Sequence, residues 1–279
     1  MTKKLRVLFV GDVVGAPGRK IVCQALPRLV HHWGLGLVVC NAENSAGGSG
    51  ISKSCHEELV DAGVDVFTLG DHIYRRDEVF TLFEQSDRLL RSANFPPDSP
   101  GAESALVRAR DGTLVGVFSL MGRTFMKPMD CPFRAADRVL ERMATATRVI
   151  IVDVHAEATS EKQALGRYLD GRVSAVLGTH THVPTADEQV FPGGTAYQTD
   201  VGMSGPYESI IGRKIDRVLA GVLSPVPCRF DVATGDVRLH GALIEIDPIT
   251  GKADRIVRVR IDQEQARRLL TDPTSVAPY

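Results

Sequence analysis

The sequence has little cysteine and no cysteine pattern that would bind zinc. Its five cysteines are odd in number and widely spaced, and no two of them form a C-x-x-C motif. A disulfide framework and a thiolate zinc site are therefore both disfavoured. This cysteine usage is typical of a reducing compartment, so the sequence predicts a cytoplasmic protein.

Long hydrophobic runs, a signal peptide and an excess of one charge are also missing. No stretch approaches the roughly 20 apolar residues of a membrane-spanning helix, and Asp12 interrupts the apolar N-terminal segment too soon for a secretory signal. We therefore expect no membrane interaction. Lys and Arg total 33 against 34 Asp and Glu. This balance gives no global basic field for duplex nucleic acid, and it neither indicates nor excludes RNA binding.

The composition is that of an ordinary globular protein. Of the 279 residues, 43% are hydrophobic and 24% are charged. No repeat, low-complexity tract or linker divides the chain, so residues 1–279 are predicted to form a single domain. The sequence does not fix the oligomeric state, and a homo-oligomer is compatible with it.

Short apolar runs alternate with longer amphipathic stretches over most of the chain. Strands are expected at residues 5–10, 37–40, 66–69, 114–120, 149–154 and 175–178. Helices are expected at residues 19–33, 52–62, 77–83, 132–146 and 160–169. This alternation predicts an α/β fold with a largely parallel sheet covered by helices.

The pattern changes toward the C-terminal end. Strands are expected at residues 228–232, 237–247 and 253–261, joined by turns, with a short helix at 263–270. This segment is predicted to be an antiparallel meander that completes the sheet or builds a second one.

Polar residues directly follow five of the predicted strands. They are Asp12, Glu43, Asn44, Asp71, His72, His155, His180 and His182. Because the carboxyl ends of parallel strands share one edge of a sheet, we expect these side chains to lie close together. The other histidines, His31, His32, His56 and His240, have no such context and are interpreted as surface or capping residues.

This set of donors is typical of a metal site. Each one alone is weak evidence, because an Asp after a strand is usually a turn or cap residue. Together, carboxylate, amide and imidazole donors without a thiolate suit Fe, Mn, Zn or Co. Seven of these eight donors, all but His72, exceed the needs of one catalytic zinc and match two ions about 3.5–4 Å apart, an arrangement suited to a phosphoryl centre.

Five segments also carry a family resemblance. They are residues 11–19, 41–48, 155–162, 178–187 and 199–207. In this order they resemble the calcineurin-like metallophosphoesterases, and within them the YmdB-like branch of bacterial phosphodiesterases. The resemblance implies a four-layer α/β/β/α sandwich of mixed sheets, with two metal ions, Fe and/or Mn, or alternatively Zn.

The resemblance also implies a role for each site residue. One ion would be held by Asp12, Glu43, Asn44 and His182. The other would be held by Glu43, Asp71, His155 and His180, with Glu43 as the bridge. His72 matches the family's proton donor to the leaving group.

Two positions depart from the pattern of the wider superfamily. Val14 stands where a D-x-H histidine is usual; the YmdB-like branch shares this feature, and Asn44 supplies the missing donor. Asp71 replaces the Asn of the usual G-N-H motif. We hypothesise that this third negative charge favours a harder or more highly charged ion, such as ferric iron, or makes the bridging water less acidic.

The sequence therefore predicts a binuclear metal-dependent phosphodiesterase that uses a metal-bridging hydroxide. The resemblance points to a small-molecule phosphodiester such as a cyclic nucleotide; the residues themselves do not fix that choice. One alternative is a phosphomonoesterase, for which Arg123 is the only extra cationic candidate near the site. Another is a non-catalytic regulator that keeps the fold and binds a nucleotide or partner. A single-metal hydrolase would leave at least three donors unexplained.

Overall fold

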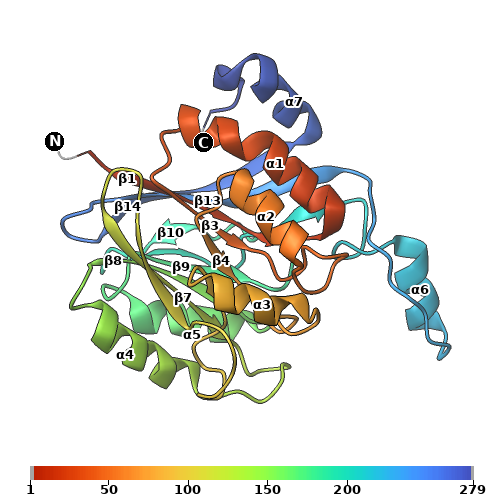
Figure 1. Ribbon diagram of the computed structural model, residues 1–279, viewed down its shortest axis with the longest axis horizontal. Helices are drawn as coiled ribbons and strands as arrows, with labels where there is room; N and C mark the ends of the chain where they lie inside the picture. Colours follow the sequence, from red (N-terminus) through yellow and green to blue (C-terminus); the bar gives the residue numbers. More distant parts are fainter. Residues whose placement is uncertain (1–2, 278–279) are drawn as a thin grey trace.

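The first of two sheets contains the N-terminal strand of the chain. A computed structural model describes residues 3–277 (Figure 1). The strands of this sheet are β1 (Leu5–Val10), β2 (Asp12–Val13), β3 (Leu37–Asn41), β4 (Val66–Thr68), β5 (Leu89–Leu90), β12 (Met203–Pro206), β13 (Val237–Ile246) and β14 (Ala253–Asp262). Their order is β2-β12-β13-β1-β3-β4-β5, with β14 paired to β13. From β1 to β5 the pairing is parallel, whereas β13 runs antiparallel to β1.

The second sheet comes from the middle of the chain. Its strands are β6 (Ser104–Arg108), β7 (Leu114–Met121), β8 (Val149–His155), β9 (Ala175–Thr179), β10 (Gln189–Val190) and β11 (Ala196–Gln198). The order is β10-β11-β9-β8-β7-β6. The four central strands are parallel, and the strand at each edge is antiparallel to its neighbour.

Helices cover the outer face of each sheet. The helices of the described residues are α1 (Gly15–His32), α2 (Lys53–Asp61), α3 (Glu78–Gln85), α4 (Pro132–Met143), α5 (Thr159–Leu169), α6 (Ile215–Leu223) and α7 (Gln263–Thr271), followed by the short 3-10 helix η1 (Pro273–Ser275). The apolar faces of α1, α2, α3 and α7 pack on the first sheet, and those of α4 and α5 pack on the second. Within residues 3–277, no helix combines the length and apolar character needed to cross a membrane.

The inner faces of the two sheets form a shared core. Phe9 of β1 and Val39 of β3 lie in one buried cluster with Ile151 of β8. Neighbouring residues on the same strands, such as Leu8 and Val152, contact the helices instead. This alternation follows from the two-residue period of a strand. The result is the four-layer α/β/β/α arrangement that the family resemblance predicted.

Two details differ from the sequence-based expectations. The parallel strands are divided between two sheets, because strands buried on both faces read alike in sequence whichever sheet they join. In addition, α1 begins at Gly15 rather than at residue 19. Pro17 is tolerated there because the first turn of a helix has no N–H bond to lose.

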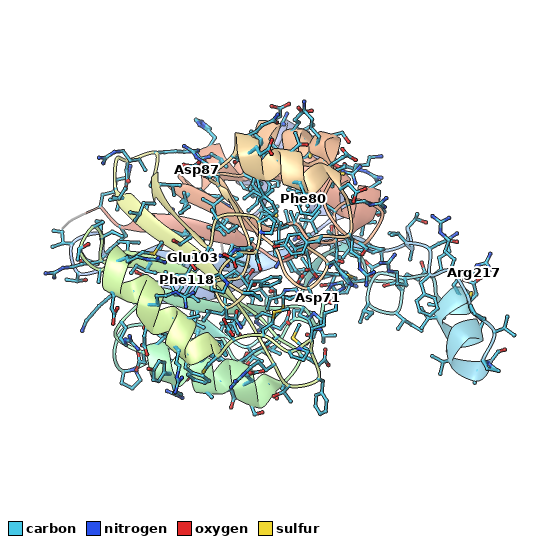
Figure 2. The ribbon with its side chains drawn as sticks, turned by 60° about the horizontal axis from the view of Figure 1, so that its bottom comes forward. Asp71, Phe80, Asp87, Glu103, Phe118 and Arg217 are labelled. Carbon is cyan, nitrogen blue, oxygen red and sulfur yellow. The ribbon has the colours of Figure 1, made fainter. Side chains whose placement is uncertain are left out.

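A projecting arm replaces one predicted strand. The arm, residues 214–231, consists of α6 and a return segment, and it extends away from the sheets in both views (Figures 1 and 2). No residue of α6 is buried. Residues 228–232, predicted as a strand, form only an isolated bridge between Val232 and Arg213. The prediction fails because the described residues provide no sheet edge beside this segment.

His240 is buried, contrary to its interpretation as a surface or capping residue. Its side chain in β13 is 7% exposed, and its Nε2 has no hydrogen-bond partner among the described residues. Burial, followed by the charges of Arg238 and Arg260, lowers the pKa of His240 to about 4. In contrast, His31 and His32 are exposed at the end of α1, as predicted.

The depressed pKa of His240 predicts a loss of stability in mild acid. Between about pH 6.5, the ordinary pKa of histidine, and about pH 4, the unfolded chain binds a proton that the folded chain does not. The free energy of unfolding therefore falls as the pH falls through this window. We expect His240→Gln to remove about 2 kcal/mol of the loss between pH 7 and pH 5.

Urea unfolding of the two proteins at both pH values measures this difference. His31→Gln is the matched control, because His31 is exposed and should leave the pH dependence as in the wild type. The same pH dependence in His240→Gln and the wild type would contradict the prediction.

Candidate metal centre

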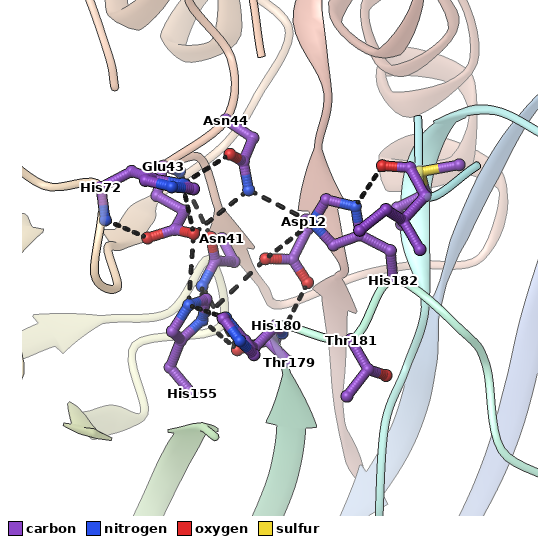
Figure 3. A network of polar contacts seen from close by, with 12 residues as sticks. Asp12, Asn41, Glu43, Asn44, His72, His155, Thr179, His180, Thr181 and His182 are labelled. Atoms are coloured by element: carbon purple, nitrogen blue, oxygen red, sulfur yellow. Dashed lines mark hydrogen bonds and ion pairs between the residues drawn. The ribbon is translucent and has the colours of Figure 1, made fainter. Parts of the chain in front are cut away.

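The predicted site residues converge where the carboxyl ends of the parallel strands of both sheets meet (Figure 3). The first sheet and the loops after its strands supply Asp12, Glu43, Asn44, Asp71 and His72. The second sheet and its loops supply His155, His180 and His182. The site is therefore assembled from two sheets rather than along a single edge.

Four of these side chains form a compact group. Glu43, Asp71, His155 and His180 each offer a ligand atom, and these atoms all lie within 4.8 Å of one another. Nε2 of His155 is 3.2 Å from Oε1 of Glu43 and 3.3 Å from Oδ1 of Asp71. These four side chains therefore have the spacing and the donor atoms that suit a metal ion.

Three further donors lie on the other side of Glu43. The amide nitrogen of Asn44 is 3.2 Å from Oε1 of Glu43 and 3.3 Å from Nε2 of His182. Its amide oxygen, the atom that can bind a cation, is 3.1 Å from Nδ1 of His72. The same His182 nitrogen is 4.0 Å from Oδ1 of Asp12. Glu43 thus lies between the two groups, where its carboxylate can serve both.

Asp12 carries an unpaired buried oxygen. Its side chain is fully buried, and Oδ2 accepts a hydrogen bond from the backbone N–H of His180 at 3.1 Å. Oδ1 has no hydrogen-bond partner among the described residues. A buried carboxylate oxygen without a partner is costly, and a cation would satisfy it.

Hydrogen bonds on the side away from the cluster fix the orientation of the His155 imidazole. Its Nδ1 is 2.9 Å from the Thr179 hydroxyl, which itself donates to Oδ1 of Asp153 at 2.7 Å. Because the Thr179 proton is directed at Asp153, the hydroxyl oxygen accepts from Nδ1–H of His155. Nε2 therefore faces Glu43 and Asp71.

The other two imidazoles are held in the same way by different partners. Nδ1–H of His182 donates to the backbone carbonyl of Ile211 at 3.0 Å, at the base of the arm. Nε2 of His180 is 3.1 Å from a carboxylate oxygen of Glu157. Asp200 holds no imidazole directly; it accepts a hydrogen bond from the backbone N–H of Thr181, between these two histidines.

These contacts fit a bound metal. In each of the three imidazoles one nitrogen is held from outside and the other points into the cluster, as metal-bound histidines require. A Cβ atom on Gly70 would lie 2.2 Å from Nε2 of His155 and 2.4 Å from Oε2 of Glu43, so a glycine keeps the centre open. The cluster can therefore hold metal ions.

Burial and mutual interaction shift the charges of the cluster. Burial raises the pKa of Asp12 to about 7. Burial also opposes charge on His155, but Glu43 and Asp71 outweigh it and hold the pKa of His155 well above its ordinary value. In turn, His155 outweighs burial and lowers the pKa of Glu43. In the metal-free protein a proton on His155 thus partly substitutes for a cation.

His72 lies at the rim of the cluster. Its side chain is 30% exposed, compared with 1% for Glu43. Nδ1 is 3.1 Å from Oδ1 of Asn44. A hydrogen bond to Glu43, followed by the charges of Glu43 and Asp71, outweighs burial and raises the pKa of His72. A partly exposed imidazole that retains its proton suits a general acid.

Sequence reasoning missed the arginines that hold the loop after Asn44. Arg76 donates to the carbonyl of Ala46 at 3.1 Å, and Arg213 donates to that of Gly47 at 3.3 Å. The loop is left-handed at Gly48, where a Cβ would meet the Arg213 guanidinium at 2.5–2.8 Å. These arginines are distant in sequence, and no motif marks them. Arg123, the predicted cationic candidate, is exposed, and its backbone N–H donates to the carboxylate of Glu161.

Comparisons with known proteins agree with this geometry. The family model described as "YmdB-like protein" matches residues 8–259. The chain belongs to this family. The resemblance predicted from the sequence motifs is therefore confirmed.

Relatives match over nearly the full chain. A Bacillus subtilis protein named 2′,3′-cyclic-nucleotide 2′-phosphodiesterase is 44% identical over 260 residues, covering 93% of this chain and 98% of the relative. A hypothetical protein from Thermus thermophilus has a crystal structure with a TM-score of 0.87 and 43% identity, covering 92% of this chain and 99% of its own. The crystal structure of a novel phosphatase from Mycoplasma pneumoniae gives a TM-score of 0.87 at 31% identity and 98% coverage of both chains.

The Thr179 hydroxyl provides a test of the imidazole orientation. Thr179→Val leaves the Asp153 oxygen and Nδ1–H of His155 without this partner, so we expect the free energy of unfolding to fall by about 1–3 kcal/mol. Loss of the fixed orientation should also weaken Mn²⁺ binding by about 10–100-fold.

Urea unfolding and an equilibrium Mn²⁺ titration measure the two effects separately. Thr179→Ser keeps the hydroxyl and should restore both values. A Thr179→Val protein that binds Mn²⁺ like the wild type would show that this hydrogen bond does not orient His155 for a metal.

Proposed function

We propose that this chain is a binuclear metal-dependent phosphodiesterase acting on cyclic nucleotides or related phosphodiesters. The observation that carries the proposal is the inward orientation of three imidazoles around buried carboxylates. The name of the Bacillus subtilis relative, together with its 44% identity, supports a phosphodiester substrate.

The donor groups divide between two metal positions. We assign Asp12, Asn44 and His182 to one position. Asp71, His155 and His180 are assigned to the other, with Glu43 shared between them. Fe and Mn are the expected ions, with Zn as an alternative, since the donors are oxygen and imidazole nitrogen. When bound, a metal pair supplies Lewis-acid stabilisation of phosphoryl oxygens and lowers the pKa of water.

The chain's own residues orient this chemistry and provide the proton. Glu43, Asp12 and His155 are at most 1% exposed and form the rigid floor of the site. At the rim, His72 is placed to protonate the departing alkoxide oxygen. Its contact with Glu43 favours the protonated form that this role requires.

The arginines beside the site suit a diester better than a monoester. A phosphate monoester carries a second negative charge, which free cationic groups would be expected to balance. Arg76 and Arg213 instead donate to backbone carbonyls of the loop after Asn44, and Arg213 also donates to that of Phe230. Their hydrogen bonds shape the loop, and a monoanionic phosphodiester has less need of them.

The first experiment combines metal analysis with a choice of substrates. We expect about two ions per chain and a higher kcat/KM for 2′,3′-cyclic AMP and bis-p-nitrophenyl phosphate than for p-nitrophenyl phosphate. His182→Ala should lower diester hydrolysis by at least about 100-fold and reduce the bound metal. Arg123→Ala is the control and should retain wild-type rates.

Each other outcome favours a different function. A preference for p-nitrophenyl phosphate, reduced in Arg123→Ala, would identify a phosphomonoesterase. Two bound ions without hydrolysis of any of the three esters would identify a binding protein that keeps the fold. A single ion per chain would contradict the binuclear assignment.

The leaving group tests the role of His72. A general acid matters most when the leaving oxygen is strongly basic, as in an alkoxide. We expect His72→Ala to slow hydrolysis of 2′,3′-cyclic AMP by about 10²–10⁴-fold. Bis-p-nitrophenyl phosphate, which releases a weakly basic phenolate, should be slowed far less. An equal loss for both substrates would indicate that His72 acts in binding rather than in proton transfer.

A further inference from the structure

The turn that carries His180 and His182 has a strained backbone. The φ angle is 93° at His180 and 65° at His182, both in the left-handed region that residues with a side chain seldom adopt. Such residues persist only where the surrounding structure holds them in place. The contacts of the intervening residue, Thr181, therefore identify what maintains the turn.

A buried ion pair lies directly behind this turn. Lys162 of α5 and Asp200 are each 1% exposed, and Nζ of Lys162 is 2.7 Å from Oδ2 of Asp200. The same ammonium donates to the backbone carbonyl of Thr179 at 2.7 Å. A lysine this deeply buried requires such partners, because an isolated charge is strongly disfavoured in the protein interior.

Asp200 extends the contact to the middle of the turn. Its Oδ2 accepts hydrogen bonds from the backbone N–H of Thr181 at 3.1 Å and from the Thr181 hydroxyl at 2.8 Å. Its Oδ1 accepts from the N–H of Gly202 at 2.8 Å. The ion pair thus bonds the residue before His180 and the residue between the two histidines.

Gly178 allows these groups to approach so closely. A Cβ atom at this position would lie 1.7 Å from the carbonyl oxygen of Thr199 and 3.1 Å from Cδ of Lys162. Without a side chain, β9 can pass between the lysine stem and the segment that leads to Asp200. A glycine at position 178 is therefore needed for the ion pair to form at this place.

We propose that Lys162 and Asp200 are positioning residues that hold the His180–Thr181–His182 turn in its left-handed conformation and thereby set the metal affinity of the site. The inference rests on the metal positions assigned under the proposed function. The pair touches neither imidazole nitrogen directly. It acts through Thr179 and Thr181, so that one buried contact controls a histidine from each of the two metal positions.

The experiment measures metal affinity and stability independently. Lys162→Met keeps most of the apolar stem and removes the ammonium, while Asp200→Asn keeps the shape and removes the charge. Ser174→Ala is the matched control, because Ser174 is fully buried at the opposite end of β9 and donates to the carbonyl of Gly251 at 2.6 Å. Each purified protein is titrated with Mn²⁺ after chelation and is unfolded separately in urea.

We expect Lys162→Met and Asp200→Asn to raise the Mn²⁺ dissociation constant by about 10–100-fold. The double variant Lys162→Met/Asp200→Asn should recover part of the affinity, since it leaves no unpaired buried charge. Ser174→Ala should lower stability and leave the dissociation constant within about threefold of wild type. Equal weakening by Ser174→Ala, or unchanged affinity in folded Lys162→Met, would overturn the proposal.

A second measurement does not depend on the metal. Amide hydrogen exchange of Thr181 in the metal-free protein reports the contact with Asp200, and we expect Lys162→Met to accelerate it while Ser174→Ala does not. Unchanged exchange in Lys162→Met would also overturn the positioning role. Failure of the wild type to bind Mn²⁺ would instead contradict the proposed function, and the two failures are thereby distinguished.

Discussion

The concentration of buried negative charge at one point is the constraint on which this structure depends. Asp12, Glu43, Asp153 and Asp200 are each at most 1% exposed, in the same network as the histidines of the site. Carboxylates cannot share a dry interior unless cations or hydrogen-bond donors compensate them. The protein compensates Asp200 with a buried lysine and Asp153 with hydroxyl and amide donors. For Asp12 the compensation is incomplete, because its Oδ1 has no hydrogen-bond partner among the described residues. The fold therefore favours the binding of positive charge at the place where we assign the ions.

The positions of the carboxylates and imidazoles link the site to the whole fold. One sheet supplies most of the carboxylates, and the other supplies the imidazoles that face them. The site exists only when the two sheets are packed together, so the shared apolar core fixes its geometry. Asp153 of β8 shows this coupling: it accepts hydrogen bonds from Asn41 and Thr68 of the first sheet and from Thr179 of β9. Because the Thr179 hydroxyl also contacts His155, a shift of one sheet relative to the other would misplace an imidazole.

The convergence of these side chains could be predicted from the sequence better than the arrangement of their surroundings, and the reason is physical. Asp12, Glu43 and His155 stand at strand ends, where a polar residue interrupts an apolar run and is easily recognised. Asp153 also interrupts an apolar run, but a single strand-end Asp has too many ordinary roles to be singled out. Lys162 lies in a helix that reads as amphipathic, and its burial depends on Gly178 and Asp200, which are remote in sequence. The division of strands between two sheets was likewise invisible to local pattern and came only from the family resemblance.

Exposure increases from the floor of the site to its rim, and this gradient separates the roles of its residues. His155 is fully buried and held by a chain of buried hydrogen bonds, whereas His180 and His72 are 22% and 30% exposed. A substrate can reach only the exposed side, so the floor residues can hold cations but cannot touch the departing group. Under the proposed function, proton transfer to the departing group would come from the rim, where His72 lies beside Asn44 and Asp71. Asp71 is also at the rim, with 24% of its side chain exposed. Its extra negative charge is therefore placed where it can act on both a bound cation and the proton of His72.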